Sequence, residues 1–204
     1  MILVSCQKIR YNGNMRADYV NPVIYQKIYH LLTYENALAL RTSLETGLRI
    51  SDVLKIKKTD LNGRTLDFIA QKTGKGGKKV LSADLARRLK QISGDNWIFE
   101  GRYGTKPRTR QAVWKNVKKA ARELHLEQNL SVHSARKTYA VDVFHKRGLG
   151  AAQKELQHDR IDNTMLYVFS DLISGGNHYQ QFSTEKFDEL YNMVKDIHKV
   201  LING

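Results

Sequence analysis

The chain has 204 residues, of which 41% are hydrophobic and 26% are charged, a composition that excludes a disordered or fibrous protein. Its 34 lysine and arginine residues outnumber the 20 aspartate and glutamate residues, and the net charge of +14 favours a polyanionic partner such as nucleic acid. A single cysteine excludes an internal disulfide and a cysteine-based zinc cluster. No stretch approaches the roughly 18 apolar residues of a membrane span. We therefore expect a cytoplasmic protein with no membrane partner.

Apolar residues recur at helical spacing through most of the chain. An asparagine followed by proline at 21–22 marks the start of the first helix, and Gly47 marks the end of the second. The predicted helices span residues 22–32, 34–47, 49–56, 83–92, 111–126, 134–148, 150–157, 162–172 and 184–202. Two packings stay open for the last helix, because an amphipathic helix after a glycine-containing linker can pack on its own chain or on a neighbouring subunit.

Residues 64–82 alternate apolar and polar side chains on both sides of a glycine-rich centre, which predicts a β-hairpin with a basic tip. We expect four lysines to project from it: Lys72, Lys75, Lys78 and Lys79. Residues 95–100 form a short apolar piece that resembles a strand. The predicted fold class is therefore mainly α with one small antiparallel β-sheet or hairpin.

A second group of basic residues follows the hairpin. The loop at 101–110 and the exposed face of the helix at 111–126 carry few acidic residues, which favours contact with phosphates over simple solvation. Together with the hairpin lysines Lys75, Lys78 and Lys79, the expected DNA-binding residues are Arg102, Lys106, Arg108, Arg110, Lys115, Lys118 and Lys119, and Arg122 lies on the same predicted face.

Several polar side chains, taken in chain order, answer one chemical demand, the cleavage of a phosphodiester without a metal or a nucleotide. A phosphate under attack becomes a crowded anion, and the guanidinium groups of Arg49 and Arg136 can stabilise it because arginine stays charged and binds two oxygens at once. A hairpin lysine can protonate the leaving sugar oxygen. Histidines can help a nucleophile with a pKa of about 10 to lose its proton, and Tyr167 fits that description.

Each of these features is weak when taken alone. The spacing of His133 and Arg136 arises readily by chance in a basic chain, and His158 or Tyr167 alone would be typical core residues. The sequence "KTGKGGKK" invites comparison with a phosphate-binding loop, but it lacks the GxxxxGK[ST] frame between a strand and a helix.

Together the motifs resemble those of the catalytic domain of the tyrosine recombinases, the phage integrase family, over about residues 22–172. "TGLRISDVL" resembles the first arginine box of the family, with Arg49 as the catalytic arginine and Asp52 as its supporting acid. "QKTGKGGKKVLS" resembles the hairpin that carries the catalytic lysine. Counting back from "VLS", aligned with the more usual "PLS", selects Lys72, whereas the glycine-lysine-glycine variant of the family selects Lys75.

The remaining motifs lie in the C-terminal half. "HSAR" resembles the His-x-x-Arg box and gives His133 and Arg136. "LQHDRIDNTMLYV" resembles the box that contains the second histidine and the nucleophile, and gives His158 and Tyr167.

The resemblance implies a mechanism, a fold and partners. The fold is that of DNA breaking and rejoining enzymes. Tyr167 attacks the scissile phosphate and forms a 3′-phosphotyrosyl bond, and Lys72 protonates the leaving 5′-oxygen to give a free 5′-hydroxyl. Arg49, Arg136 and His158 hold the nonbridging oxygens, and His133 assists proton movement at the tyrosine. No cofactor or metal is implied, because the phosphotyrosine conserves the bond energy. The implied partner is double-stranded DNA, bound by a homotetramer. Without DNA the protein is expected to be a monomer or a weak oligomer. The need for an accessory DNA-bending protein stays open, and the expected location is the nucleoid.

The chain also departs from the family pattern. Gln157 replaces the usual glycine before the histidine, and the proline of the lysine box is missing. Residues 1–21 form an arm that is too short for the added N-terminal domain of most members, so the chain is either a minimal recombinase or a piece of a longer protein. We expect a catalytic domain at 22–172 and a linker and helix at 173–204, which can pack in trans.

Two other functions stay open at this level. A type IB topoisomerase shares the chemistry and would relax supercoiled DNA that lacks a specific site. A catalytically silent DNA-binding accessory protein would keep the fold alone, although an intact set of Arg, Lys, His, Arg, His and Tyr argues against it.

Overall fold

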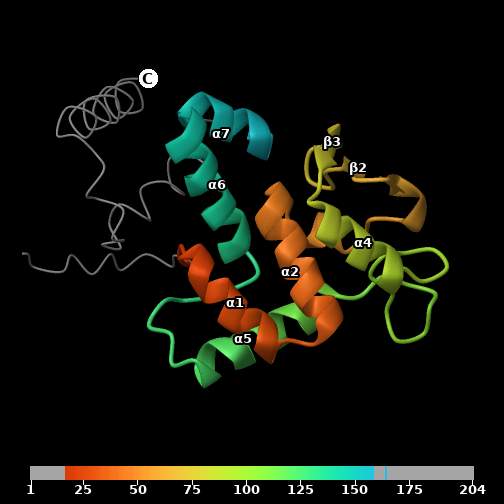
Figure 1. The fold of residues 1–204 in the computed structure, drawn as a ribbon, viewed down its shortest axis with the longest axis horizontal. Coiled ribbons are helices and arrows are strands. Elements are labelled where there is room, and N and C mark those ends of the chain that lie inside the picture. The colour runs from red at the N-terminus through yellow and green to blue at the C-terminus, as the bar shows by residue number, and fades with distance from the viewer. Residues whose placement is uncertain (1–16, 159–163, 165–204) are drawn as a thin grey trace, which may run out of the picture.

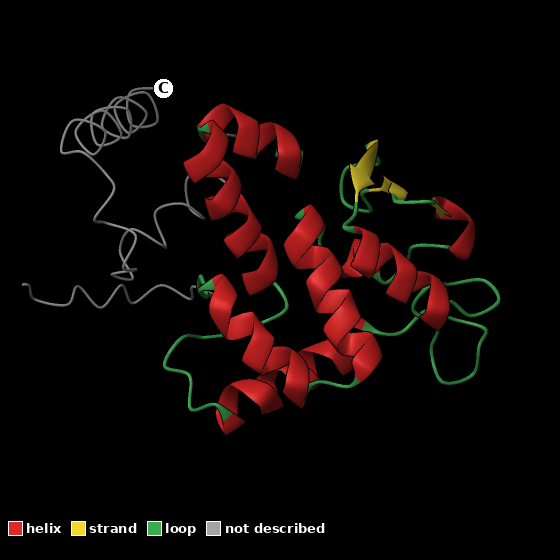
Figure 2. Cartoon of the chain, viewed as in Figure 1, coloured by secondary structure: helices red, strands yellow, loops and turns green. Residues whose placement is uncertain are grey.

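The structure, a computed structural model, describes residues 17–158 and residue 164 of the chain. Most of the predicted N-terminal arm, the predicted helix at 162–172 apart from residue 164, the predicted helix at 184–202, and Tyr167 lie outside the described residues. The described part is mainly helical with one small antiparallel sheet, as the sequence predicts (Figures 1 and 2). None of the described helices has the length and hydropathy that crossing a lipid bilayer requires.

The elements follow one another in a simple order along the chain. The helices are α1 (Pro22–Leu31), α2 (Tyr34–Thr46), α3 (Ile50–Val53), α4 (Ala83–Ile92), α5 (Arg110–Glu123), α6 (Ser134–Arg147) and α7 (Leu149–Leu156), with a 3-10 turn η1 (Lys58–Asp60) after α3. The strands are β1 (Leu61–Asn62), β2 (Thr65–Ile69) and β3 (Gly76–Val80). They pair in the order β1-β2-β3, all antiparallel, with Thr65 opposite Val80 and Ile69 opposite Gly76.

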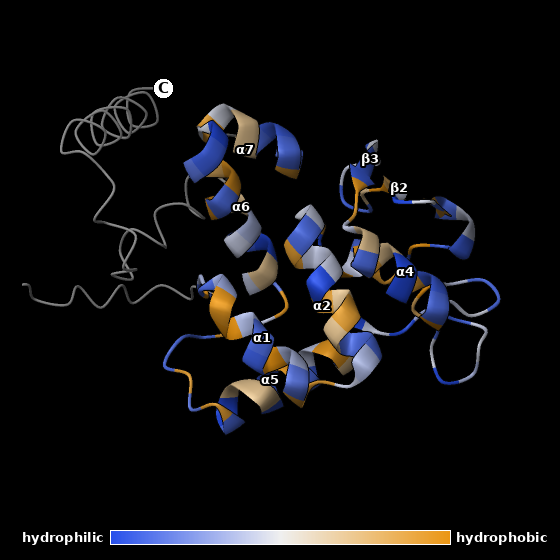
Figure 3. Cartoon of the chain, in the orientation of Figure 1, coloured by the Kyte–Doolittle hydropathy of each residue, from blue (hydrophilic) through white to orange (hydrophobic). Residues whose placement is uncertain are grey.

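Helix α2 is the centre of the core and lies among α1, α3, α4, α5 and α6 (Figure 1). Its residues Leu38, Ala39 and Leu40 are buried. In Figure 3 polar and apolar residues alternate along the helices, which is the pattern that lets each helix bury one face. This packing fixes the turn that follows α2, where the first candidate catalytic residue lies.

Helix boundaries follow local capping. The side chain of Asn21 accepts the backbone N–H of Val23 at 2.9 Å, with proline at the first position of α1, as predicted. Thr109 caps α5 through the N–H of Ala112 at 3.2 Å, so α5 begins one residue earlier than the apolar spacing indicates.

The predicted strand at 95–100 is wrong. This piece contains only two isolated bridges, one from Trp97 to Lys57 and one from Glu100 to Pro107. The carboxylate of Glu100 accepts the backbone N–H of Asn96 at 2.9 Å, which closes the segment into a turn. Burial of the two apolar residues between the bridges, rather than strand pairing, accounts for the apolar run.

Candidate active site

Arg49 lies in the turn between α2 and α3, where the backbone is tightly constrained. Gly47 has a φ of +71°, and a β-carbon there would lie 2.3 Å from the ring of Tyr139 on α6. Only glycine satisfies both conditions. Leu48 and Ile50, on either side of Arg49, are buried. The backbone of Arg49 is thus held, while its side chain keeps 20% of its surface exposed.

Asp52 lies beside Arg49, where the predicted supporting role would require it. One carboxylate oxygen is 3.9 Å from Nη1 of Arg49, and the other accepts the backbone N–H of Gln71 at 3.2 Å. A separation of 3.9 Å is longer than a hydrogen bond. The Arg49 N–H groups can therefore turn to an incoming anion without breaking a short contact.

Arg136 on α6 joins three separate parts of the chain. Its side chain is buried, with only 3% of the residue exposed. Nη1 donates to the carbonyl of Gly47 at 2.5 Å, and Nη2 donates to the carbonyl of Leu156 at 2.7 Å. Nη2 also lies 3.2 Å from Nε2 of His158. One guanidinium therefore links the turn before Arg49 to the end of α7 and to His158.

The ring of His158 is held on both sides. Its Nδ1 lies 2.9 Å from the hydroxyl of Thr164, which is fully buried. A guanidinium can only donate, so we assign the acceptor role to Nε2 and the ring proton to Nδ1, which donates to Thr164. Gln153 holds the backbone of His158: its carbonyl accepts the His158 N–H at 3.1 Å, and its side-chain amide donates to the His158 carbonyl at 3.2 Å.

His133 immediately precedes α6 and lies in a strongly positive environment. Its Nε2 is 3.2 Å from Nη2 of Arg110, the first residue of α5. Burial lowers the pKa of His133, and the positive charges of Arg110, Arg136 and Arg49 lower it further. The ring is therefore neutral at neutral pH and able to accept a proton.

These contacts bring four of the predicted catalytic residues into one region: Arg49, His133, Arg136 and His158. Fixed guanidinium groups and imidazoles around a partly buried position form a site that can stabilise an anion such as a phosphate under attack. Tyr167, the predicted nucleophile, lies outside the described residues, three positions after the buried Thr164.

The two candidate lysines of the hairpin lie in its turn. Lys72 and Lys75 are both exposed, between β2 and β3. The turn is closed by the N–H of Ala70, which donates to the carbonyl of Lys75 at 2.9 Å. Gln71, next to Lys72, is the residue whose N–H reaches Asp52. The turn is therefore connected to the region of Arg49.

The lysines of β3 differ from the prediction that all of them project. Lys78 does project, with a side chain that is 73% exposed and 3.3 Å from Asp67. Lys79 turns inward, with only 13% of its side chain exposed, and forms an ion pair with Glu155. Because its ammonium is already bound there and also lies over the ring of Tyr139, Lys79 is not placed to contact DNA.

The basic loop and α5 form a second surface. Arg102, Lys106 and Arg110 are exposed. Arg108 is an exception, because its guanidinium is 3.4 Å from the Glu35 carboxylate and donates to Asn36 at 3.3 Å, so it braces the loop against α2 instead of facing outward.

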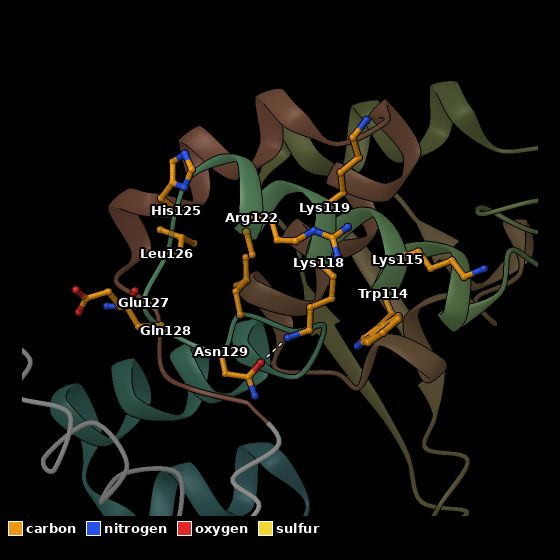
Figure 4. A pocket seen from close by; sticks show the side chains of 12 residues that line it. Trp114, Lys115, Lys118, Lys119, Arg122, His125, Leu126, Glu127, Gln128 and Asn129 are labelled. Carbon is orange, nitrogen blue, oxygen red and sulfur yellow. Dashed lines mark hydrogen bonds between the residues drawn. The ribbon is translucent and has the colours of Figure 1, made fainter. Parts of the chain in front are cut away.

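The C-terminal part of α5 borders a groove of about 1150 Å³ (Figure 4). Basic side chains line it, together with the partly exposed ring of Trp114. They are Lys115, Lys118, Lys119 and Arg122. Lys118 donates to the side chain of Asn129 on the far wall, as the dashed line in Figure 4 shows. The groove thus combines positive charge with an aromatic face, which suits a nucleic-acid backbone.

Sequence reasoning missed three residues that hold the site in place. Thr164 lies within the stretch "LQHDRIDNTMLYV" between His158 and Tyr167, so the motif resemblance already included it. Gln153 and Tyr139 read as ordinary helix residues, and their contacts connect different elements, so no local pattern identifies them.

Known proteins resemble this chain in sequence and in fold. Residues 15–172 match the model of the phage integrase family. The tyrosine recombinase XerD of Staphylococcus saprophyticus is 28% identical over 150 residues, which cover 66% of this chain and 50% of that protein. The tyrosine recombinase XerD of Listeria innocua is 28% identical over 153 residues, covering 67% and 50%. The chain thus spans about half the length of the curated relatives it matches.

Solved structures show the same fold. A lambda integrase (residues 75–356) dimer bound to a COC′ core site superimposes with a TM-score of 0.69 at 19% identity, covering 84% of this chain and 65% of that one. The XerH site-specific recombinase bound to palindromic difH substrate gives a TM-score of 0.63 at 18% identity, covering 91% and 56%. With a family match that covers most of its length and a fold shared with these enzymes, the chain belongs to the phage integrase family.

Proposed function

We propose that this chain is the catalytic part of a site-specific recombinase that cleaves and rejoins double-stranded DNA through a 3′-phosphotyrosine. The observation that carries the proposal is Arg136, which links the Arg49 turn to His158 through one buried guanidinium. Such an arrangement suits a phosphate whose charge increases during attack. The relatives named tyrosine recombinase support the same activity.

The cleavage step forms one bond and breaks one bond. The phenolic oxygen of Tyr167 attacks the phosphorus, and the bond from phosphorus to the 5′-oxygen breaks. The tyrosine proton passes to the neutral ring of His133, and Lys72 gives a proton to the leaving 5′-oxygen, with Lys75 as the alternative donor. Arg49 and Arg136 hold the nonbridging oxygens, and His158 orients the guanidinium of Arg136 through its Nε2. The phosphotyrosine conserves the bond energy for the reverse step, so the proposal includes no cofactor.

The proposal extends to DNA contacts and partners. The exposed basic residues of the hairpin turn, the loop and α5 would bind DNA phosphates, with Lys79 and Arg108 excluded by their internal contacts. A lambda integrase tetramer bound to a Holliday junction, which has a TM-score of 0.63 and 20% identity with this chain, supports a tetramer on DNA. In this proposal the catalytic domain spans residues 22–172, and the segment at 173–204 contacts a neighbouring subunit of the tetramer. The protein acts on the nucleoid in the cytoplasm.

The phosphotyrosine is tested with a nicked duplex that traps the covalent adduct. The site is found by selecting random duplexes that bind the protein. We expect Tyr167→Phe to abolish the adduct on a denaturing gel while DNA binding persists, because the change removes only the attacking oxygen. Tyr103→Phe is the matched control, since Tyr103 is 82% exposed in the basic loop, and it should leave the adduct intact.

The same assay separates the rival functions. An adduct that persists in Tyr167→Phe would remove Tyr167 from its role. A wild-type protein that binds the duplex and forms no adduct would indicate the silent accessory protein. Steady relaxation of supercoiled plasmid that lacks the selected site would indicate the topoisomerase.

A further inference from the structure

One strand of the hairpin is attached to α6 and α7 by a single inward-facing lysine. Lys79 binds the carboxylate of Glu155 and donates to the Glu155 carbonyl at 3.2 Å and to the hydroxyl of Tyr139 at 3.4 Å. Its ammonium also lies 5.4 Å from the centre of the Tyr139 ring. Burial raises the pKa of Glu155, but the contacts with Lys79, Arg147 and Tyr139 outweigh burial and lower that pKa to about 2. The carboxylate is therefore charged throughout the neutral range.

A second attachment comes from Gln157, the residue that replaces the family's usual glycine. Gln157 has φ +52° and ψ +42°, the left-handed conformation that glycine adopts most easily. A side chain there costs about 1 kcal/mol. In this chain the side-chain amide donates to the carbonyl of Gly76, the first residue of β3, at 3.3 Å. The strained position thus provides a hydrogen bond between the hairpin and the residue that precedes His158.

The hairpin turn is also attached to the Arg49 region, through a residue that follows β2. The N–H of Gln71 donates to Asp52, and its side-chain oxygen accepts from Lys55 at 2.8 Å. Lys72 is the next residue. The turn that carries Lys72 and Lys75 is therefore held at both ends, by α3 and the residues after it at Gln71 and by the end of α7 at Gly76.

We propose that Lys79, Glu155 and Gln157 form a clasp that positions the hairpin turn, so that its lysine reaches the leaving oxygen. The clasp residues are positioning residues, because none of them lies among the residues proposed to touch the phosphate. The inference rests on the proposed function, since it concerns the lysine that acts as general acid there.

A substrate with sulfur in place of the bridging 5′-oxygen isolates this role. A thiol is far more acidic than an alcohol, with a pKa of about 8.5, so its phosphorus–sulfur bond breaks to give a thiolate that needs no proton. A protein whose general acid is displaced should be slow on the oxygen substrate and normal on the sulfur substrate. Loss of folding or of DNA binding would slow both equally.

The variants are Glu155→Gln and Gln157→Gly, tested as the full chain on nicked duplexes of both kinds. Displacement of a catalytic group costs about tenfold to hundredfold in rate, so we expect that loss with oxygen and a loss below about threefold with sulfur. Lys72→Ala should show the same pattern in a stronger form. Lys154→Gln, an exposed neighbour on α7, is the control and should leave both rates unchanged.

The outcomes are distinct. Equal losses on the two substrates, or no loss on either, would overturn the clasp while the proposed function stands. A wild-type protein that forms no adduct with either substrate would overturn both. If Glu155→Gln does not fold, Gln157→Gly still decides the question, because glycine relieves the left-handed backbone while it removes the bond to Gly76.

Discussion

The two candidate catalytic histidines are held by different neighbours, and this gives them different properties. His158 lies between Arg136 and the buried hydroxyl of Thr164, which fixes the orientation of its ring. His133 faces Arg110, and the positive charges of Arg110, Arg136 and Arg49 lower its pKa. A neutral imidazole in such a field accepts a proton only while a negative charge develops beside it. This condition arises when tyrosine attacks a phosphate.

The charge state of His133 leads to a test by titration. The pKa of His133 is below its ordinary value of 6.5, first because of burial and then because of Arg110, Arg136 and Arg49. The unfolded chain therefore binds more protons than the folded chain just below pH 6.5, so His133 weakens the fold as the pH falls through that window. We expect an NMR titration midpoint below 6.5 for His133, and a higher midpoint in Arg110→Ala. A midpoint at or above 6.5 in the wild type would contradict this environment.

At the scale of elements, the turn between α2 and α3 depends on its packing against α6. Gly47 is left-handed and touches the Tyr139 ring, whereas Gly63 is left-handed with open space around it. Gly63→Ala should cost about 1 kcal/mol of unfolding free energy from backbone strain. Gly47→Ala should cost about 2 to 4 kcal/mol, because overpacking adds to the strain. Urea unfolding measures both, and equal losses would show that the Tyr139 contact does not constrain the turn.

Most elements could be predicted from local patterns. The helices show apolar spacing and caps such as Asn21, and the hairpin shows alternation around glycines. The prediction at 95–100 failed because a short apolar run is also compatible with a buried turn. The prediction that Lys79 projects from the hairpin was wrong, because alternation along a strand does not show what covers each face. The carboxylate that binds Lys79 belongs to Glu155, which lies 76 positions away. Contacts of that separation leave no trace in local spacing.

The site itself became predictable only through the family motifs. Arg49 and Arg136 are far apart in sequence, and nothing in composition or periodicity indicates that Arg136 binds the carbonyl of Gly47. The motif resemblance supplied the set of residues, and the fold explains the set, because α6 packs against α2 and brings the two boxes together.

At the scale of the whole molecule, the net charge of +14 predicts that added salt stabilises the free protein but weakens its binding to DNA. Screening reduces self-repulsion, so the melting temperature of the free protein should rise with added NaCl. Salt also removes the advantage of counterion release, so DNA affinity should fall by about a thousandfold or more between about 50 and 200 mM. Thermal melts test the predicted rise in melting temperature, and fluorescence anisotropy tests the predicted fall in DNA affinity. An affinity that does not change with salt would argue against a phosphate-binding surface.

The ring of Tyr139 covers Gly47 on one side, and its hydroxyl lies beside Lys79 and Glu155 on the other. One side chain is thus shared by two parts of the molecule that have separate tasks. A substitution at position 139 would therefore change both the packing against Gly47 and the contacts with Lys79 and Glu155. Over evolution, positions 79, 139 and 155 should therefore change as a group: a lineage that loses the acid at 155 should also lose the lysine at 79, whereas the glycine at 47 should persist wherever an aromatic ring occupies 139.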